Sequence, residues 1–215
     1  TDGIATGHTN TRGHHWNGDG TKIYAVDGSG TDITEWSCTA YDISTCSSTS
    51  SPLDYSGIGS DSRDFDFNSD GTKMVIVTNS NDKITELSGT AYDISTFTTT
   101  GNSITISGTE NPVGITWDGD GTDLWVALAN PSGNNIWGYS CSTAYDLSTC
   151  SLSGLEFDTT AQDSNEGGIY FDPTGEFLYY AGSTPDDPFQ YNVKSLDNQA
   201  TLSNYSPNCK FCLGY

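Results

Sequence analysis

The fold is decided by a stretch that reads FDFNSDGTKMVIV over residues 65–77. Three further stretches resemble it: HHWNGDGTKIYAV (14–26), ITWDGDGTDLWV (115–126) and IYFDPTGEFLYY (169–180). The glycine that follows the shared turn stands at positions 20, 71, 121 and 175, so successive copies are 51, 50 and 54 residues apart. A repeat period of this length is typical of the blades of a β-propeller.

Each period predicts four short strands. A brief aromatic strand ends in an Asn/Asp–Gly turn, where glycine can adopt positive φ. The most apolar run follows, as in KMVIV (73–77), then an alternating strand such as ITEW (33–36). The last strand is polar, as an outer edge requires, for example SITIS (103–107) or LEF (155–157). No helical period is present, so we predict an all-β propeller of four blades with four antiparallel strands each.

The repeats divide a single domain at about 8–57, 58–108, 109–160 and 161–215. The segment GIATG (3–7) precedes the first blade where a fourth strand precedes each later one. We therefore expect residues 1–7 to close the ring as the outer strand of the last blade, the alternative being a frayed terminus. Four blades are the lower limit for a propeller, so an open array, or a ring completed by a second chain, stays open as an alternative.

The charge of the chain excludes several classes of protein. Seven Lys+Arg stand against 28 Asp+Glu, a formal net charge of −21. Nucleic-acid binding needs clustered basic residues, and docking on anionic lipid needs them too. No stretch approaches 18 apolar residues, so no membrane insertion is expected. The chain begins TDG without a basic and apolar leader, which fits a processed secreted protein.

Four of the six cysteines follow the repeat. Cys38 and Cys46 flank TAYDIST in the first copy, and Cys141 and Cys150 flank the matching segment in the third. The second copy has glycine and phenylalanine at these two places, so both partners are lost together. Paired presence and absence predicts the disulfides Cys38–Cys46 and Cys141–Cys150.

The remaining pair is predicted to form the disulfide Cys209–Cys212. A redox motif would need a βαβ context, and a zinc site would need two more ligands that no histidine can be assigned to supply. Disulfides place the protein in an oxidising, extracellular compartment. Asn204 begins the sequon NYS and is a glycosylation candidate.

The segments DGTK followed by an apolar run, and IWGYSCSTAYDLST (136–149), resemble a tandem-repeat family with the consensus pDGTKmYv…vYqYtLSTAWDIST. The resemblance covers residues 14–180, and the sequence departs from the family in its hairpin cysteines and in having only four copies. Such repeats occur in secreted bacterial proteins and in virion or tail proteins of marine phages, and are taken to form β-propellers. The resemblance implies extracellular binding or structural roles, and it carries no catalytic residues over.

The acidic turns are candidates for calcium, since clustered side-chain oxygens suit a hard cation. The candidate ligands are Asp19, Asp70, Asp118 and Asp120. These loops lack the downstream bidentate glutamate of an EF-hand, and tight turns use the same residues for backbone reasons. We therefore favour structural turns and predict no cofactor.

One mouth of the ring is expected to hold residues that come just before the first strands. Arg12 and Arg63 stand in equivalent slots there, in the pairs Thr11-Arg12 and Ser62-Arg63, and the fourth copy has Glu166-Gly167 at the matching pair of positions. The two arginines could bind an acidic or polyol ligand through paired hydrogen bonds. The alternative is that each neutralises a nearby acid such as Asp61 or Asp64.

The aromatic residues divide into three groups. One group recurs at a single position and is predicted to pack between blades: Trp16, Phe67, Trp117 and Phe171. A second group is predicted to anchor the Thr-Ala-Tyr-Asp hairpin: Tyr41, Tyr92 and Tyr145. Trp36 and Trp137 are less regular; exposed, they would stack on sugar rings, and buried, they would be core.

The sequence leads us to expect a non-enzymatic extracellular propeller that acts in surface recognition or assembly, as a subunit of an appendage, a fibre or a virion decoration. Its partners would be further copies of itself, another surface protein or glycans. The first alternative is a lectin with repeat-related sites on the ring mouth. The second is a hydrolase at the same mouth, for which no nucleophile elbow, HExxH or phosphate-binding loop gives support.

Overall fold

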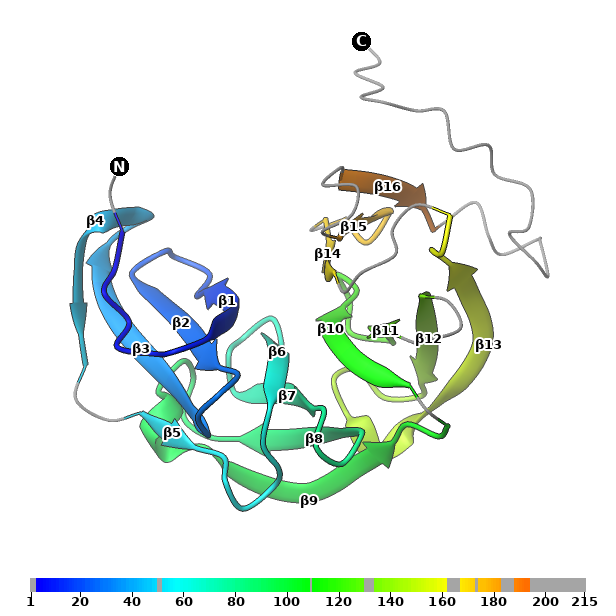
Figure 1. The fold of residues 1–215 in the computed structure, drawn as a ribbon, viewed down its shortest axis with the longest axis horizontal. Helices are drawn as coiled ribbons and strands as arrows, with labels where there is room; N and C mark the ends of the chain where they lie inside the picture. Colours follow the sequence, from blue (N-terminus) through cyan, green and yellow to red (C-terminus); the bar gives the residue numbers. More distant parts are fainter. Residues whose placement is uncertain are drawn as a thin grey trace, which may run out of the picture.

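The computed structural model describes residues 3–49, 52–108, 110–129, 134–161, 167–172, 174–182 and 188–193. The chain is an all-β propeller of four blades set in a ring, as the repeat predicts (Figure 1). Within the described residues the helical elements are two short 3-10 turns, η1 (Ile94–Thr96) and η2 (Leu147–Thr149). Neither of these helices is long or apolar enough to cross a membrane.

The strands of each blade pair in sequence order and antiparallel. Blade 1 contains β1 (Thr11–Trp16), β2 (Lys22–Asp27), β3 (Asp32–Thr39) and β4 (Asp42–Ser48), and β5 (Leu53–Asp54) also pairs with β3. Blade 2 contains β6 (Ser62–Phe67), β7 (Lys73–Thr78), β8 (Lys83–Ser88) and β9 (Thr98–Thr105). Blade 3 contains β10 (Asn111–Trp117), β11 (Asp123–Ala129), β12 (Asn135–Cys141) and β13 (Cys150–Asp158). The described part of blade 4 contains three strands, β14 (Gly168–Phe171), β15 (Phe177–Ala181) and β16 (Pro188–Asn192).

The turn after each first strand is held by side chains of the repeat. In blade 2 the Asp70 carboxylate accepts the N–H of Thr72 at 2.9 Å, and Gly71 has a φ of 70°. The ring of Tyr92 covers Gly71, where a Cβ would lie 2.4 Å from the ring, so only glycine fits. Tyr92 also donates its hydroxyl to the carbonyl of Ser69. Tyr41 and Tyr145 make the same contacts in blades 1 and 3, which confirms that these tyrosines anchor the hairpins.

Each blade has two faces, and the alternation of side chains along its strands assigns them. We call the side toward the preceding blade the leading face and the side toward the following blade the trailing face. Met74 of β7 lies on the leading face of blade 2 and packs in one core with Tyr24 of blade 1. Val75, the next residue, lies on the trailing face and packs with Leu124 of blade 3. A third core of the same kind joins blades 3 and 4.

The aromatic residues predicted to pack between blades do so in blades 2, 3 and 4. Phe67, Trp117 and Phe171 are each at most 5 % exposed and lie in these cores. Trp16 is half-buried, because none of the blades that the structure describes lies against the leading face of blade 1. It packs instead on Tyr41, with ring centroids 5.6 Å apart.

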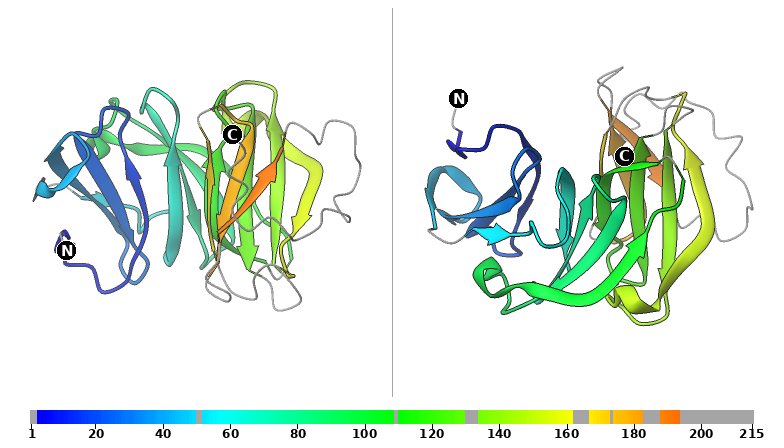
Figure 2. Two further views of the ribbon diagram at one scale, coloured as in Figure 1. Left: turned by 90° about the horizontal axis from the view of Figure 1, so that it is seen from above. Right: turned by 60° about the horizontal axis from the view of Figure 1, so that its bottom comes forward.

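The expectation that residues 1–7 close the ring is wrong for the residues that the structure describes. Residues 3–10 form no strand, and Ile4 packs on a cluster of Ile23, Ala25 and Trp36 in blade 1. Both views in Figure 2 place the N-terminal segment beside blade 1, away from blade 4. The cluster of Ile23, Ala25 and Trp36 lies on the leading face of blade 1, which none of the described blades covers, so burying Ile4 there removes apolar surface from water. Figure 1 shows the ring open between β1 and β14.

The two hairpin disulfides are confirmed. Cys38 is bonded to Cys46, and Cys141 to Cys150. In blade 2, Phe97 takes the place of one cysteine, is 4 % exposed and fills the hairpin with its ring. Residues 209–212 and the glycosylation candidate Asn204 lie outside the described residues.

Candidate functional site

The inner strands of the four blades line a cavity of about 660 Å³ on the inner side of the open ring. β1, β6, β10 and β14 all contribute to its wall. The sequence placed Arg12 and Arg63 at a mouth of the ring, and both line this cavity. A cavity of this size is in the range of sites for small molecules.

The chemistry of the wall comes from two repeat positions that differ between blades. Seven residues before the turn glycine, blades 1, 3 and 4 carry glycine, and blade 2 carries Asp64. Five residues before it, the four blades carry His15, Asp66, Thr116 and Tyr170. All the members of both sets except Gly114 line the cavity. Because the four blades have the same backbone geometry, these substitutions place Asp64, Asp66 and His15 together on the side of blades 1 and 2.

Asp66 joins three consecutive blades. Its Oδ1 lies 2.9 Å from His15 Nε2 of blade 1, and its Oδ2 accepts the N–H of Trp117 of blade 3 at 2.9 Å. His15 Nδ1 lies 2.6 Å from the carbonyl oxygen of Trp16, which can only accept a hydrogen bond. Both ring nitrogens of His15 therefore face acceptors, and the ring is best satisfied as a cation that forms an ion pair with Asp66. Burial lowers the pKa of His15, but the hydrogen bond and the charge of Asp66 outweigh it and raise that pKa above its usual value.

Asp64 is a buried carboxyl in the cavity wall. Burial raises the pKa of its carboxyl to about 7, although Oδ2 accepts the N–H of Ile115 at 3.1 Å. Its position depends on Gly13, where a Cβ would lie 2.1 Å from Asp64 Oδ1. A carboxyl group that exchanges its proton near neutral pH in a cavity is suited to general acid–base catalysis.

The two arginines stand beside these acids. Arg63 pairs with Asp61, with Nε 3.3 Å from Oδ1, so the ion pair that the sequence offered as an alternative is formed. Arg12 packs against Gly28, where a Cβ would lie 2.4 Å from the arginine Nε. The chain has only seven Lys+Arg, and two of them line one cavity.

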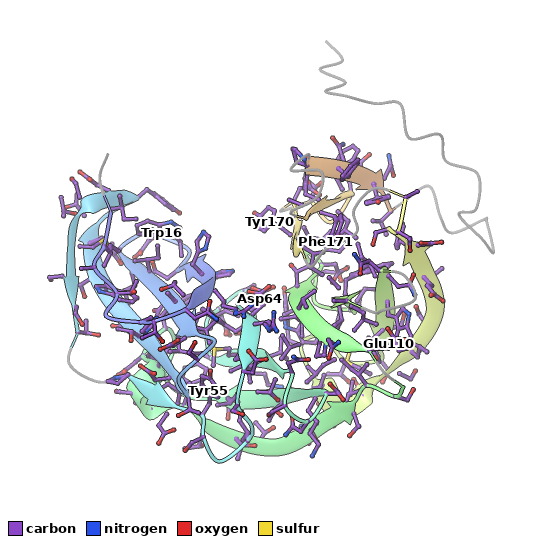
Figure 3. All side chains as sticks on the ribbon, viewed as in Figure 1. Trp16, Tyr55, Asp64, Glu110, Tyr170 and Phe171 are labelled. Atoms are coloured by element: carbon purple, nitrogen blue, oxygen red, sulfur yellow. A yellow bond between two sulfur atoms is a disulfide. The ribbon has the colours of Figure 1, made fainter. Side chains whose placement is uncertain are left out.

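Blades 3 and 4 form an apolar wall opposite these charges. Val113, Ile115 and Ile169 line it, together with Tyr170 and Tyr179. The two tyrosines are cross-strand neighbours in β14 and β15 and are 56 % and 37 % exposed. Figure 3 shows Asp64 on the inner side of the ring and Tyr170 on the side of β14 that faces the opening.

Two residues that the sequence proposed for ligand binding lie away from the cavity, and a third is not among the described residues. Trp36 is 3 % exposed in the core of blade 1, so it cannot stack on a sugar. Trp137 is partly buried against the core between blades 2 and 3 and is not part of the cavity wall. Glu166 lies outside the described residues.

Asp64, Asp66 and His15 were missed as functional residues. The signal that could have found them is the divergence of the repeat, because Asp64 replaces a glycine that the other three copies keep.

The acidic turns use their carboxylates within the turn. Asp19 and Asp120 accept the N–H of the threonine two residues later, at 2.9 and 3.0 Å, as Asp70 does. Asp118 accepts the N–H of Asp123 at 3.0 Å. These contacts match the structural turn that the sequence analysis favours over calcium.

A different group could supply metal ligands. His8, Asp27 and Asp32 have ligand atoms within 4.8 Å of one another. All three side chains already have hydrogen bonds: Asp27 accepts the N–H of Ser29 at 2.9 Å, His8 Nε2 lies 2.9 Å from Thr34 Oγ1, and Asp32 Oδ2 accepts the Thr34 hydroxyl at 3.4 Å.

Comparison with known proteins defines the fold. No protein-family model matches the chain, and no curated protein matches it in sequence. Among solved structures, a proposed 6-phosphogluconolactonase of Bacteroides uniformis superimposes with a TM-score of 0.59 at 16 % identity, over 85 % of this chain and 50 % of the other. The periplasmic gluconolactonase PpgL of Pseudomonas aeruginosa gives 0.56 at 12 % identity, over 85 % and 49 %. The nidogen/laminin complex gives 0.56 at 15 %, over 85 % and 60 %.

The chain belongs to the propeller fold. It spans about half the length of the propellers that it matches. Two of these neighbours are named for lactonase activity. The expectation that the protein is not an enzyme is therefore corrected. The propeller fold is one that carries enzymes, and the expectation was formed without the acidic residues that line the cavity.

Proposed function

We propose that the protein is a hydrolase that opens the lactone of a small sugar acid in its central cavity. The observation that carries the proposal is Asp64, a buried carboxyl with a pKa of about 7 in the cavity wall, set beside the His15–Asp66 ion pair. The names of the structural neighbours supply the substrate class. The two disulfides support an oxidising compartment, outside the cell or in the periplasm.

Asp64 is assigned the role of general base. Its carboxylate takes a proton from a water molecule as the water oxygen bonds to the lactone carbonyl carbon. The resulting tetrahedral intermediate collapses, the bond between that carbon and the ring oxygen breaks, and the ring oxygen receives the proton. The product is an open-chain hydroxy acid, which releases one proton at neutral pH.

Arg12 and Arg63 are assigned to anion binding. A guanidinium group can donate paired hydrogen bonds to a carboxylate or a phosphate, and it stabilises the negative charge that develops on the carbonyl oxygen. The chain is strongly acidic, so binding of an anionic ligand in this cavity depends on these two guanidinium groups to offset the repulsion from nearby carboxylates.

A second candidate is a sugar-binding site without turnover. The observation that favours it is the exposed pair Tyr170 and Tyr179 at the cavity wall. Aromatic faces bury apolar area against a sugar ring at low cost in side-chain entropy. This candidate corresponds to the lectin alternative of the sequence analysis, with its binding site at the mouth of the ring.

The test is lactone hydrolysis followed by proton release, with glucono-δ-lactone and 6-phosphoglucono-δ-lactone as substrates and the spontaneous rate subtracted. Asp64→Asn should lower kcat about a hundredfold or more. Glu156→Gln, the same chemical change on the exposed β13 strand, should leave the rate unchanged. Rates equal to spontaneous hydrolysis for both lactones would refute the enzyme. Calorimetric binding of gluconate without turnover would then support the second candidate.

A further inference from the structure

We propose that a second copy of this chain completes the ring, by packing the leading face of its blade 1 on the trailing face of blade 4. The starting point is the residue four positions after the turn glycine, which lies on the trailing face of every blade. In blades 1, 2 and 3 the next blade covers it, and Tyr24, Val75 and Trp125 are at most 1 % exposed. In blade 4 the equivalent residue is Tyr179, which is 37 % exposed.

Two more trailing-face positions behave in the same way. The third strand places Ile33, Ile84 and Ile136 there, all fully buried, at the register where blade 4 has the exposed Pro188. Five residues before the turn glycine, Thr116 of blade 3 is 5 % exposed, whereas Tyr170 of blade 4 is 56 % exposed. The trailing face of blade 4 is therefore built like an inter-blade face and remains uncovered at these positions.

The opposite side of the opening belongs to blade 1. Its leading face carries His14 and Trp16, where blade 2 carries Phe65 and Phe67. Phe65 and Phe67 are buried against the preceding blade, whereas His14 is exposed and Trp16 is half-buried. The opening is thus bounded by one uncovered trailing face and one partly covered leading face, the two kinds of surface that meet at each junction within the chain.

The curvature of the four blades also leaves room for more blades. They superimpose on about half of propellers that are nearly twice as long, which means that their arc follows a larger ring. A second copy related by a two-fold axis offers its blade 1 to blade 4 of the first, and its blade 4 to blade 1 of the first. The result is a closed ring of eight blades, within the range known for propellers.

The charges of the two surfaces permit this contact. Tyr170, Tyr179 and Pro188 on one side and Trp16 on the other are uncharged at neutral pH. The leading face of blade 1 also carries the titratable groups His14, His8, Asp27 and Asp32, which lie beside this contact. The whole chains repel each other, since each carries a formal charge of −21. Association should therefore strengthen as salt screens that repulsion.

The experiment is the mass in solution of the purified chain, by light scattering and sedimentation, across a range of concentrations at low and at about 0.5 M salt. We expect about 46 kDa, twice the 23.0 kDa of one chain, reached at lower protein concentration in the higher salt. The double variant Tyr170→Glu, Tyr179→Glu should stay at 23.0 kDa. Leu152→Glu, which changes a residue 54 % exposed on the outer strand of blade 3, should still dimerise.

A second measurement needs no variant. Hydrogen exchange of the wild-type chain should show protection of β14 and β15 that rises with protein concentration, while β13 does not change. A mass of 23.0 kDa at every concentration and salt would overturn the proposal. So would a mass that grows without limit, or dimerisation of the double variant equal to that of the wild type.

Discussion

The two halves of the inner wall have the same backbone and opposite chemistry. Blades 1 and 2 present arginines, His15, Asp64 and Asp66 to the cavity, whereas blades 3 and 4 present aliphatic residues and tyrosines. The repeat gives each blade an equivalent inner strand, so the difference lies in side chains at a few positions. Residues that keep the repeat pattern maintain the fold of each blade. Residues that depart from it on the inner strands create the candidate site.

The largest expected effect on stability comes from replacing Asp66, which joins three blades. It belongs to the polar half of the wall, formed by blades 1 and 2. Asp66→Ala leaves the His15 cation and the buried N–H of Trp117 without their acceptor. We expect a loss of about 3–5 kcal/mol in the free energy of unfolding, measured by urea denaturation. Thr116→Ala, at the same position of the apolar half, should cost about 1 kcal/mol, and equal losses at both positions would remove the contrast.

A smaller loss is expected from filling the space that Asp64 occupies. Gly13→Ala places a Cβ 2.1 Å from Asp64 Oδ1 and 2.9 Å from Asp64 Cα, so the two strands must separate. We expect a loss of about 1–3 kcal/mol in the free energy of unfolding. The double variant with Asp64→Gly should recover only part of it, because the carboxylate is gone while the backbone of β6 still crowds the new methyl group. Strictly additive effects would show that Gly13 does not make room for Asp64.

The polar half should also make stability depend on pH. Asp64 has a pKa of about 7 when folded, against about 4 when unfolded, so between these values the folded chain keeps a proton that the unfolded chain has lost. Raising the pH through this window therefore lowers stability, by at most about 1.4 kcal/mol per pH unit for one group. His15, with its raised pKa, adds the same sign above pH 6.5.

The check is the free energy of unfolding from about pH 4 to about pH 7.5 for the wild type and Asp64→Asn. The variant should lose part of the slope and keep the part due to Asp118, whose pKa burial also raises to about 7. A slope unchanged by the variant would contradict a buried Asp64.

The smallest effect on stability is expected in the apolar half. Tyr170→Ala removes a side chain that is 56 % exposed in the single chain, so the free energy of unfolding should change by about 0.5 kcal/mol or less at concentrations where the chain is monomeric. Ile169→Ala, the buried neighbour in the same strand, should cost about 2–5 kcal/mol. A large effect of Tyr170→Ala under these conditions would show that other residues of the same chain cover this face.

The sequence was sufficient to predict the repeat architecture. The spacing of the turn glycines predicted the four blades, and the paired cysteines predicted both hairpin disulfides, because both signals are local and recur. The tyrosines of the hairpins and the aromatic residues between blades followed from the same alignment. Trp36 and Trp137 show the limit of that reasoning, since the sequence left open whether they were exposed or buried.

The sequence alone determined the four repeats, the order of the strands within each repeat and the placement of Arg12 and Arg63 on the inner wall. Only the tertiary structure decided where the N-terminal segment packs, which blade faces are uncovered, and that His15, Asp64 and Asp66 form one cluster. The physical reason is the range of the interactions. Turns, strands and hairpin disulfides depend on residues within one repeat, whereas the charge state of Asp64 and the cover over Tyr170 depend on which blades come to lie beside them.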